Sequence, residues 1–410
     1  MPPDLASTPN GRPRGTRAPE GRVAAVHRQT RRGLAVAVVF SVAAVVATVV
    51  PHDTGAWLPL HLFLVGGLLS AISTTTQMLA VTWSSSPAPP PVVAAAQRWC
   101  LAAGTVALVA GREAEVRALV EWGGLAVVVA VVAMVPILLA IRRHAVTDRF
   151  TPAIDAYVTA LAAGAAGTSI AVVLGTGRAG DRAVELRDTH LTVNLLGLVG
   201  LVVAGTLPFF AATQVRSKMS PRATPLVMRA TTALLATSVA TAGLGQFLGR
   251  PGLAAVGLFA YGAGLVVIAA LLPIYGRRQR SWAGPRLVQL GAGLAWWTAT
   301  TIVFAVVVLT ERDDRPVLRA MVIGGFAQIL MASLAYLGPV LRGGGHERLT
   351  AGFAITRSWP ALVAGNVAAI GALVDHRGLM TAGLAIWFAD AVIRAVRLVL
   401  GSASAGATVP

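Results

Sequence analysis

Charged residues are scarce in this chain of 410 residues: they make up 12% of it, whereas hydrophobic residues make up 55%. A single soluble core could not bury so much apolar surface, so we expect lipid to be the solvent of most of the chain. Cysteine is nearly absent, and the single residue Cys100 excludes an internal disulfide, a Cys-x-x-Cys redox pair and a thiolate-rich metal site. Because a phosphate-binding glycine loop, a Walker lysine, an HExxH motif and a nucleophile elbow are also lacking, soluble enzyme classes have no support.

Acidic residues are few beside basic ones, and the formal net charge is +17. The basic residues lie between apolar runs instead of along one helical face or in an arginine-rich tail. We therefore interpret the charge as membrane topology and expect no nucleic-acid partner. Arg31 and Arg32 precede the first apolar run, as in a twin-arginine export signal, but eleven further runs follow, so we interpret this segment as a signal anchor.

Apolar runs that suit the ~30 Å hydrocarbon layer of a bilayer recur twelve times along the chain. They predict an all-α, polytopic membrane protein of about twelve transmembrane helices. Residues 1–32 are rich in Pro, Arg and Gly, so we expect a disordered basic cytoplasmic arm there, a transmembrane helical domain at 33–400 and a disordered C-terminal tail at 401–410. The predicted spans are 33–50, 57–82, 97–110, 119–141, 155–174, 190–213, 225–248, 252–275, 286–310, 317–340, 359–374 and 378–400.

The orientation of these spans follows from the distribution of charge. Most Lys and Arg residues fall in segments on the same side as the amino terminus, whereas most Asp and Glu residues fall in the loops of the other side. Because cytoplasmic loops retain cations during insertion, we expect both termini to be cytoplasmic and the protein to lie in a bacterial plasma membrane.

Two of the seven histidines belong to predicted spans, where an ionisable side chain raises a functional question. His61 begins the second span and His190 the sixth, so both imidazoles lie near the outer interface at a similar depth. Glycines one to two turns later leave room for another backbone or a flat cofactor. Imidazole is a common ligand of haem iron, copper and zinc, so both residues are candidate metal and cofactor ligands. The alternative is that each histidine bonds a loop. The other five are placed in loops or tails: His27, His52, His144, His346 and His376.

The second, sixth and tenth spans share further features. If Arg319 takes the histidine position in the tenth span, Gly324-Gly325 match Gly66-Gly67 in register, and Pro208 and Pro339 are expected to interrupt the sixth and tenth spans near their inner ends. The spacing predicts three pseudo-symmetric groups of four helices.

This combination resembles the subunit I fold of haem-copper oxidases and, more closely, the actinobacterial NnrS-like membrane proteins. The stretches that carry the resemblance are 61–83, 190–219 and 324–342, and the helix count carries the rest. The resemblance implies a haem- or copper-binding protein of nitrogen-oxide or copper metabolism with a redox partner besides the lipid bilayer. A terminal oxidase, by contrast, needs six ligand histidines, which this chain lacks. Met78 stands near the place where relatives carry another histidine, but at roughly 25 Å from His61 it could not share one ion, and packing is its simpler role.

Other polar residues within the spans keep alternatives open. Asp390 and Arg394 are four residues apart in the last span, which predicts a neutral ion pair, with a proton relay as the alternative. A twelve-helix secondary transporter would place its substrate near the midplane, at Gln246, Gln289 or Asp390. A cofactor-free scaffold or accessory subunit is the third hypothesis. The metal-binding hypothesis implies binding, electron transfer or protection of a metal centre, and enzymatic turnover is not favoured.

Overall fold

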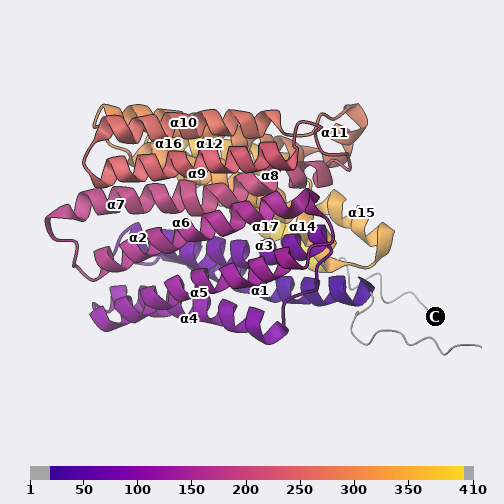
Figure 1. Ribbon diagram of the computed structural model, residues 1–410, viewed down its shortest axis with the longest axis horizontal. Coiled ribbons are helices and arrows are strands. Elements are labelled where there is room, and N and C mark those ends of the chain that lie inside the picture. The colour runs from indigo at the N-terminus through magenta and orange to yellow at the C-terminus, as the bar shows by residue number, and fades with distance from the viewer. Residues whose placement is uncertain (1–18, 401–410) are drawn as a thin grey trace, which may run out of the picture.

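The computed structural model describes residues 19–400, which form a bundle of roughly parallel and antiparallel helices (Figure 1). Each of the twelve predicted spans corresponds to one helical rod, and three of the rods combine two α-helical parts with a π-helical part. The rods are α1 (Pro19–Ala47), α2-η1-α3 (Trp57–His61, Leu62–Leu68, Leu69–Ser84), α4 (Pro91–Glu113), α5 (Arg117–Arg143), α6 (Thr151–Gly175), α7-η4-α8 (Ala183–Thr192, Val193–Gly200, Leu201–Gln214), α9 (Pro225–Phe247), α10 (Pro251–Ala270), α12 (Pro285–Leu309), α13-η5-α14 (Arg315–Ala320, Met321–Ala327, Gln328–Arg342), α16 (Trp359–Leu373) and α17 (Arg377–Leu400).

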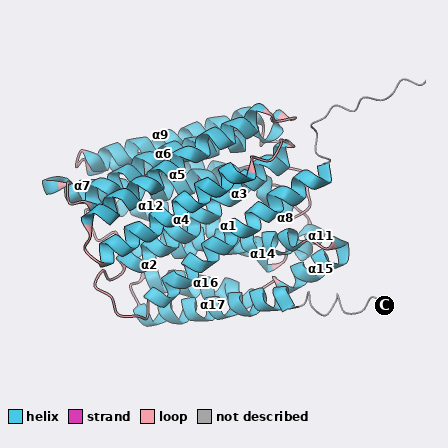
Figure 2. Ribbon diagram, turned by 90° about the horizontal axis from the view of Figure 1, so that it is seen from below, coloured by secondary structure: helices cyan, strands magenta, loops and turns pink. Residues whose placement is uncertain are grey.

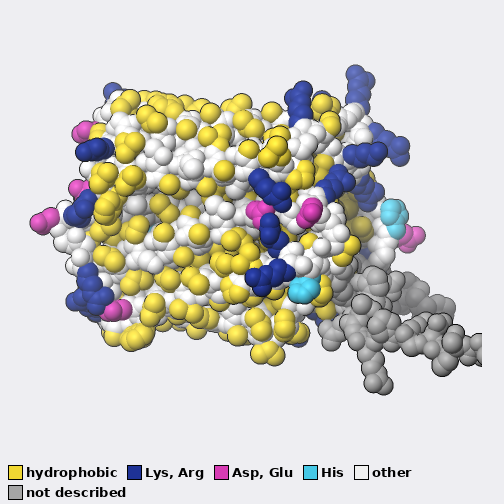
Figure 3. Space-filling model, viewed as in Figure 1, with side chains coloured by type: hydrophobic (Ala, Val, Ile, Leu, Met, Phe, Trp, Pro, Cys, Tyr) yellow, Lys and Arg dark blue, Asp and Glu magenta, His cyan; other side chains and the backbone are white. Residues whose placement is uncertain are grey.

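Ten of these rods are long and apolar enough to cross a membrane, and α16 is a shorter apolar helix. Charged side chains gather towards the two ends of the bundle, while apolar side chains cover much of the face between them (Figure 3). The chain is therefore a polytopic, all-α membrane protein. One end of the bundle carries α2 and α7, and the other carries the short helices α11 (Arg277–Ala283) and α15 (Gly345–Ile355) (Figure 1). We call them the α2/α7 end and the α11/α15 end.

The first helix begins earlier than predicted. α1 starts at Pro19 instead of residue 33, so the part of the expected disordered arm from Pro19 onward is helical. Val26 and Thr30 are 2% and 1% exposed, and Arg31 donates a hydrogen bond to the Leu341 carbonyl at 3.3 Å. Contacts that the sequence does not reveal thus stabilise this segment. Residues 1–18 and the predicted tail at 401–410 lie outside the described residues.

Proline begins many of the helices and does not break those that contain it. Pro91, Pro225, Pro251 and Pro285 occupy the first turns of their helices, where the missing N–H has no partner to lose. The expected interruptions at Pro208 and Pro339 are absent, since α8 and α14 both continue through them. In α14 the carbonyl four residues before Pro339, that of Ala335, instead accepts a hydrogen bond from the Thr356 hydroxyl at 2.6 Å. A bond from outside the helix therefore replaces the one that proline removes.

Three helical hairpins repeat the same construction: α4-α5, α9-α10 and α16-α17. The loops span residues 114–116, 248–250 and 374–376, and the middle residue of each has positive φ: 56° at Glu115, 62° at Gly249 and 51° at Asp375. In each loop the last N–H donates to the carbonyl of a glycine five residues back, at 2.7–2.8 Å. Those glycines and the ones twelve residues later are Gly111 and Gly123, Gly245 and Gly257, Gly371 and Gly383.

The paired glycines let the two helices of each hairpin approach closely. A Cβ on Gly111, Gly245 or Gly371 would lie 2.9 Å from the backbone carbonyl carbon of the leucine eight residues later. The same spacing of Gly, Leu and Gly in all three hairpins is an internal repeat in both sequence and structure. It divides the bundle into α1–α5, α6–α10 and α12–α17.

The three groups surround a common centre. The first helix of each group packs on the π-containing rod: α1 on η1 and α3, α6 on η4 and α8, and α12 on η5 and α14. Successive groups also adjoin through α5 with α6 and through α10 with α12. The structure therefore has the predicted arrangement of three groups of four spans. Figure 2 shows the last two helices of the third group, α16 and α17, at one edge of the bundle.

Candidate functional site

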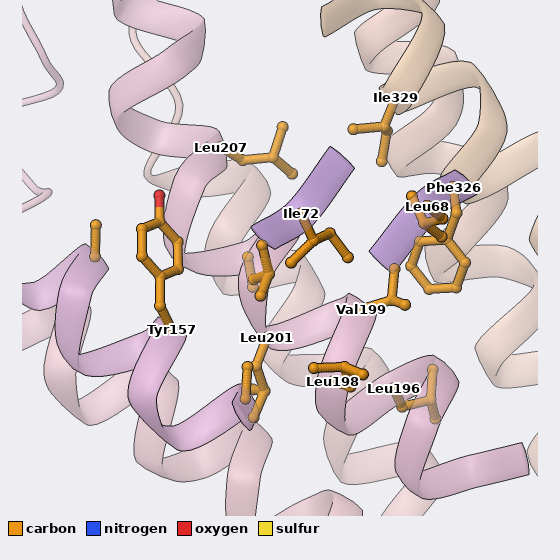
Figure 4. Close-up of a cluster of buried hydrophobic side chains, with 14 of the residues drawn as sticks. Leu68, Ile72, Tyr157, Leu196, Leu198, Val199, Leu201, Leu207, Phe326 and Ile329 are labelled. Carbon is orange, nitrogen blue, oxygen red and sulfur yellow. The ribbon is translucent and has the colours of Figure 1, made fainter. Parts of the chain in front are cut away.

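The three π-containing rods enclose a central apolar cavity of about 90 Å³. Each rod supplies six residues at positions i, i+3, i+4, i+7, i+8 and i+11, which is one face of a helix. Numbering offsets of 131 and 258 residues relate the three sets without exception. The sets are Leu68, Ala71, Ile72, Thr75, Thr76, Leu79; Val199, Val202, Val203, Thr206, Leu207, Phe210; and Phe326, Ile329, Leu330, Ser333, Leu334, Leu337. Figure 4 shows some of these side chains, among them Leu68, Val199 and Phe326.

Three hydroxyl groups occupy equivalent positions around this cavity. Thr75, Thr206 and Ser333 each donate a hydrogen bond to the carbonyl four residues earlier, at 2.7, 2.6 and 2.7 Å. Tyr157 adds a bond of 2.9 Å between its hydroxyl and that of Thr206. Because the hydroxyl protons are used within the helices, the cavity presents few donors and suits small apolar molecules better than water.

His61, His190 and Arg319 each lie one to three residues before a π-helical segment. The three residues are on the side of that segment nearer to the α2/α7 end. These segments, η1, η4 and η5, are the π-helices of the described part of the chain. Such segments widen the helix by one residue and occur frequently at functional sites. The offset of 258 that relates the cavity linings also relates His61 to Arg319, whereas the offset of 131 relates His61 to Thr192, so His190 lies two residues before the matching position.

His61 is held by its own helix. Its Nδ1 lies 2.8 Å from the carbonyl oxygen of Trp57, and its ring stacks on the indole at 4.0 Å between centroids. A carbonyl oxygen only accepts, so Nδ1 carries the proton and Nε2 carries the lone pair. No described residue bonds to that Nε2. The expected alternative, a histidine bonded to a loop, does not describe His61.

His190 is held by the neighbouring helix α6. Its Nδ1 lies 2.9 Å from the Gly167 carbonyl oxygen, so this nitrogen also carries the proton. Asn194 lies close by: its Nδ2 is 3.0 Å from the same Nδ1 and donates to the His190 carbonyl at 2.9 Å. No described residue bonds to Nε2 of His190. Both histidines therefore have the tautomer that leaves Nε2 available as a ligand.

The first two central rods carry His61 and His190, and a charge on His190 would act on His61. Arg319, the equivalent residue of the third group, instead pairs with Asp375 at 2.7 Å. Among residues 19–400 no group of three or more His, Cys, Asp or Glu side chains is arranged to hold a metal ion. The donor set of this candidate site is therefore two imidazoles.

The room expected beside the glycines is taken by neighbouring helices. A Cβ on Gly67 would meet the Ser41 hydroxyl at 2.7 Å, and the space beside Gly66 holds the ring of Phe40. In the third group the indole of Trp296 fills the corresponding space, 2.7 Å from a Cβ on Gly324. Of the two occupants expected beside these glycines, another backbone or a flat cofactor, the structure places neighbouring helices there, and α1 and α12 insert side chains into the space.

The remaining polar candidates have structural roles. Asp390 accepts hydrogen bonds from Arg394 at 2.8 Å and from Ser358 at 2.7 Å, which is the predicted neutral pair. Met78 is 3% exposed within the hydrophobic core, as its packing role requires. Gln246 and Gln289 each keep one buried amide atom without a partner.

Three of the other five histidines lie in loops between helices, as expected: His52, His144 and His376. The other two, expected in a tail or loop, lie on helices instead: His27 on α1 and His346 on α15. No second histidine cluster results from these positions.

Sequence reasoning missed the hydroxyl ring. The signal was available, because the offset of 258 that matches Gly66 with Gly324 also matches Thr75 with Ser333. In comparisons with known proteins, no family model matches this chain and no curated protein is significantly similar to it.

Proposed function

We propose that this membrane protein binds a metal ion through Nε2 of His61 and Nε2 of His190. The observation that supports the proposal is the matched state of the two rings: each donates its Nδ1 proton to a backbone carbonyl and leaves Nε2 without a partner. Metal-binding histidines use this arrangement, since the carbonyl fixes the tautomer and orients the ring. His144 has the same bond at an exposed turn, whereas His61 and His190 are partly buried on two central rods at one end of the bundle.

Copper fits the described geometry better than haem does. A flat porphyrin would need open space against the central rods, but the space beside Gly66, Gly67 and Gly324 is filled by Phe40, Ser41 and Trp296. Two imidazoles suit copper, whereas a closed structural zinc site needs four protein ligands. A bound copper ion supplies one-electron redox chemistry and an open coordination position. The protein residues fix the ring orientations and, at Trp57, cover one face of His61.

The threefold repeat of the twelve helices and the histidines on the second and sixth of them support the resemblance to haem-copper oxidase subunit I and to NnrS-like proteins. It does not make the chain a terminal oxidase, since the third central rod carries Arg319 and no histidine. On this proposal the α2/α7 end faces outward, both termini are cytoplasmic, and the protein serves copper or nitrogen-oxide metabolism with a redox partner. Secondary transporters are built from twofold repeats, so the threefold repeat gives that alternative no support.

Copper stoichiometry in matched variants tests the proposal. The detergent-purified protein is loaded with copper, separated from free metal and analysed for copper content and optical absorption. His144 provides the control, because its Nδ1 also lies 2.8 Å from the carbonyl four residues earlier, but at an exposed turn. We expect about one copper per chain in the wild type and in His144→Ala, and loss of that copper in His61→Ala and His190→Ala.

Three results would contradict the copper site. These are a wild type that binds no copper, retention of copper in both variants, and equal loss in His144→Ala. A haem Soret band that is present in the wild type and disappears in the two variants would show that His61 and His190 are ligands of haem instead of copper.

A further inference from the structure

A buried arginine with incomplete hydrogen bonding lies at the α11/α15 end, opposite the two histidines. Arg286, in the first turn of α12, is 1% exposed. Its Nε donates to the Ala283 carbonyl at 3.3 Å, but its Nη1 and Nη2 have no hydrogen-bond partner. Its guanidinium carbon lies 4.4 Å from the ring centroid of Phe353 and 5.7 Å from that of Tyr336. The rings ease the burial of the charge, yet several unpaired donors remain costly.

Two further arginines lie near the ring of Trp282. The guanidinium carbon of Arg216 is 3.6 Å from the Trp282 ring centroid, and that of Arg357 is 5.8 Å from it. Arg357 Nη2 donates to the Trp282 carbonyl. Arg357 Nε and Trp282 Nε1 are buried and, like the Arg286 nitrogens, have no partner. We call Arg216, Trp282, Arg286 and Arg357 the arginine cluster; its unpaired buried atoms are all donors.

No negative charge balances the arginine cluster within residues 19–400. None of its three arginines forms an ion pair with a described carboxylate. Arg216 and Arg357 lie close enough to Arg286 for their charges to act on it unfavourably. Asp390, on α17, is already bonded to Arg394 and Ser358. Because a buried cation is expected to be paired, the cluster lacks an anion.

A surface cavity of about 460 Å³ adjoins this cluster and includes Arg357 in its wall. Arg280 and Ser281 add polar groups, while Val288 and Trp359, which are 47% and 58% exposed, form an apolar side. A basic floor beside an exposed apolar wall fits a ligand that carries an anionic group and an apolar part, although a free anion also fits the basic floor.

We propose that the arginine cluster binds a phosphate group, with the Nη atoms of Arg286, Arg357 Nε and Trp282 Nε1 as donors. Four donors suit the several oxygens of a phosphate better than the two of a carboxylate, and planar guanidinium groups match phosphate geometry. The phosphate belongs either to the headgroup of an anionic lipid or to a free phosphate anion. Basic pockets between transmembrane helices bind lipid headgroups in this way.

Thermal unfolding of the full-length, delipidated protein in maltoside micelles tests the site, with Cys100 as the reporter. Cys100 is the single cysteine of the chain and is partly buried, so a thiol-reactive dye follows unfolding. The additions are phosphatidylglycerol, a diacylglycerol with the same acyl chains and no phosphate, and inorganic phosphate. The variants are Arg286→Met, which removes the unpaired donors, and Arg278→Gln, an exposed residue of α11 whose loss changes the net charge equally.

We expect phosphatidylglycerol, but not diacylglycerol, to raise the unfolding temperature of the wild type and of Arg278→Gln. In Arg286→Met the apparent affinity should fall about tenfold or more, because the site loses its charge-assisted donors. Stabilisation by inorganic phosphate instead of lipid would identify a free anion as the ligand. If Arg286→Met does not fold, Arg357→Gln supplies the same comparison. A wild type that responds to neither phosphate source, or an equal loss in Arg278→Gln, would overturn the proposal.

Discussion

Gly257 lies where α10 crosses α9 in the middle hairpin, and alanine there should destabilise the protein. A Cβ on Gly257 would lie 2.6 Å from the Ser238 carbonyl oxygen and 2.8 Å from the Ala242 Cα, which are backbone atoms that cannot rotate away. The helices would have to separate by several tenths of an ångström. Overpacking of this kind costs about 1–3 kcal/mol, and the repeat predicts the same result at Gly123 and Gly383.

Gly291 provides a control of opposite sign. It lies inside helix α12, and a Cβ there would meet nothing within 4 Å. Alanine at an unobstructed helical position stabilises by roughly 0.5–1 kcal/mol, because glycine loses more backbone freedom on folding. The same substitution should therefore lower stability at one position and raise it at the other.

Dye labelling of Cys100 during heating measures both variants in the same micelles. Gly257→Ala should unfold a few degrees below the wild type, and Gly291→Ala at or above it. Cys100 lies in the α4-α5 hairpin, outside the mutated helices, so the probe itself is unchanged. If Gly257→Ala were as stable as Gly291→Ala, the close approach of α9 and α10, and with it the equivalence of the three hairpins, would be refuted.

Three further predictions follow from the same structure. Ala71→Val adds methyl groups to the cavity of about 90 Å³. At 24 cal/mol per Å³ filling the whole cavity is worth about 2 kcal/mol, so the free energy of unfolding should rise by less than that. A lower unfolding temperature would show that the cavity has no space there. Gly249→Ala should destabilise the protein by about 1 kcal/mol in thermal unfolding, because the φ of 62° at this residue is left-handed. Glu115→Gly, at the equivalent position with a φ of 56°, should stabilise the protein by a similar amount. Effects of the same sign in the two variants would contradict this. Arg394→Met should cost roughly 1–3 kcal/mol by leaving the partly buried Asp390 without its partner. Adding Asp390→Asn should restore much of the loss, and no recovery in the double variant would argue against the pair.

The twelve spans were predictable because hydropathy and length are local properties of the sequence. The threefold grouping was also predictable from the register of Gly66-Gly67 with Gly324-Gly325, and the cavity lining repeats the same offset. The start of α1 was not, because residues from Pro19 onward are polar in sequence and are held by tertiary contacts such as the bond from Arg31 to the Leu341 carbonyl.

The candidate site was only partly predictable. His61 and His190 stand out in sequence as histidines in apolar runs, but their tautomers depend on the carbonyls of Trp57 and Gly167. The carbonyl of Gly167 lies on another helix. Which of the two expected occupants lies beside the glycines was not predictable for a similar reason, since Phe40 is remote in sequence from the Gly66 that it covers.

Arg286 shows how a topology rule can hide a site. In sequence it is one of many cations expected on the cytoplasmic side, and its position at the start of a span gives it no distinction. Only the structure shows that it is 1% exposed and lacks partners for its terminal nitrogens. Burial separates it from exposed neighbours such as Arg278.

X-ray absorption at the copper edge of the loaded protein tests the central claim most directly, because it reports the atoms bound to the metal. The account predicts a first shell that includes two imidazole nitrogens at about 2 Å, with the outer-shell scattering typical of histidine rings, and loss of this copper signal in His190→Ala. A shell with sulfur from Met78 or Cys100, or one unchanged by loss of His190, would contradict the assignment of His61 and His190 as the metal ligands.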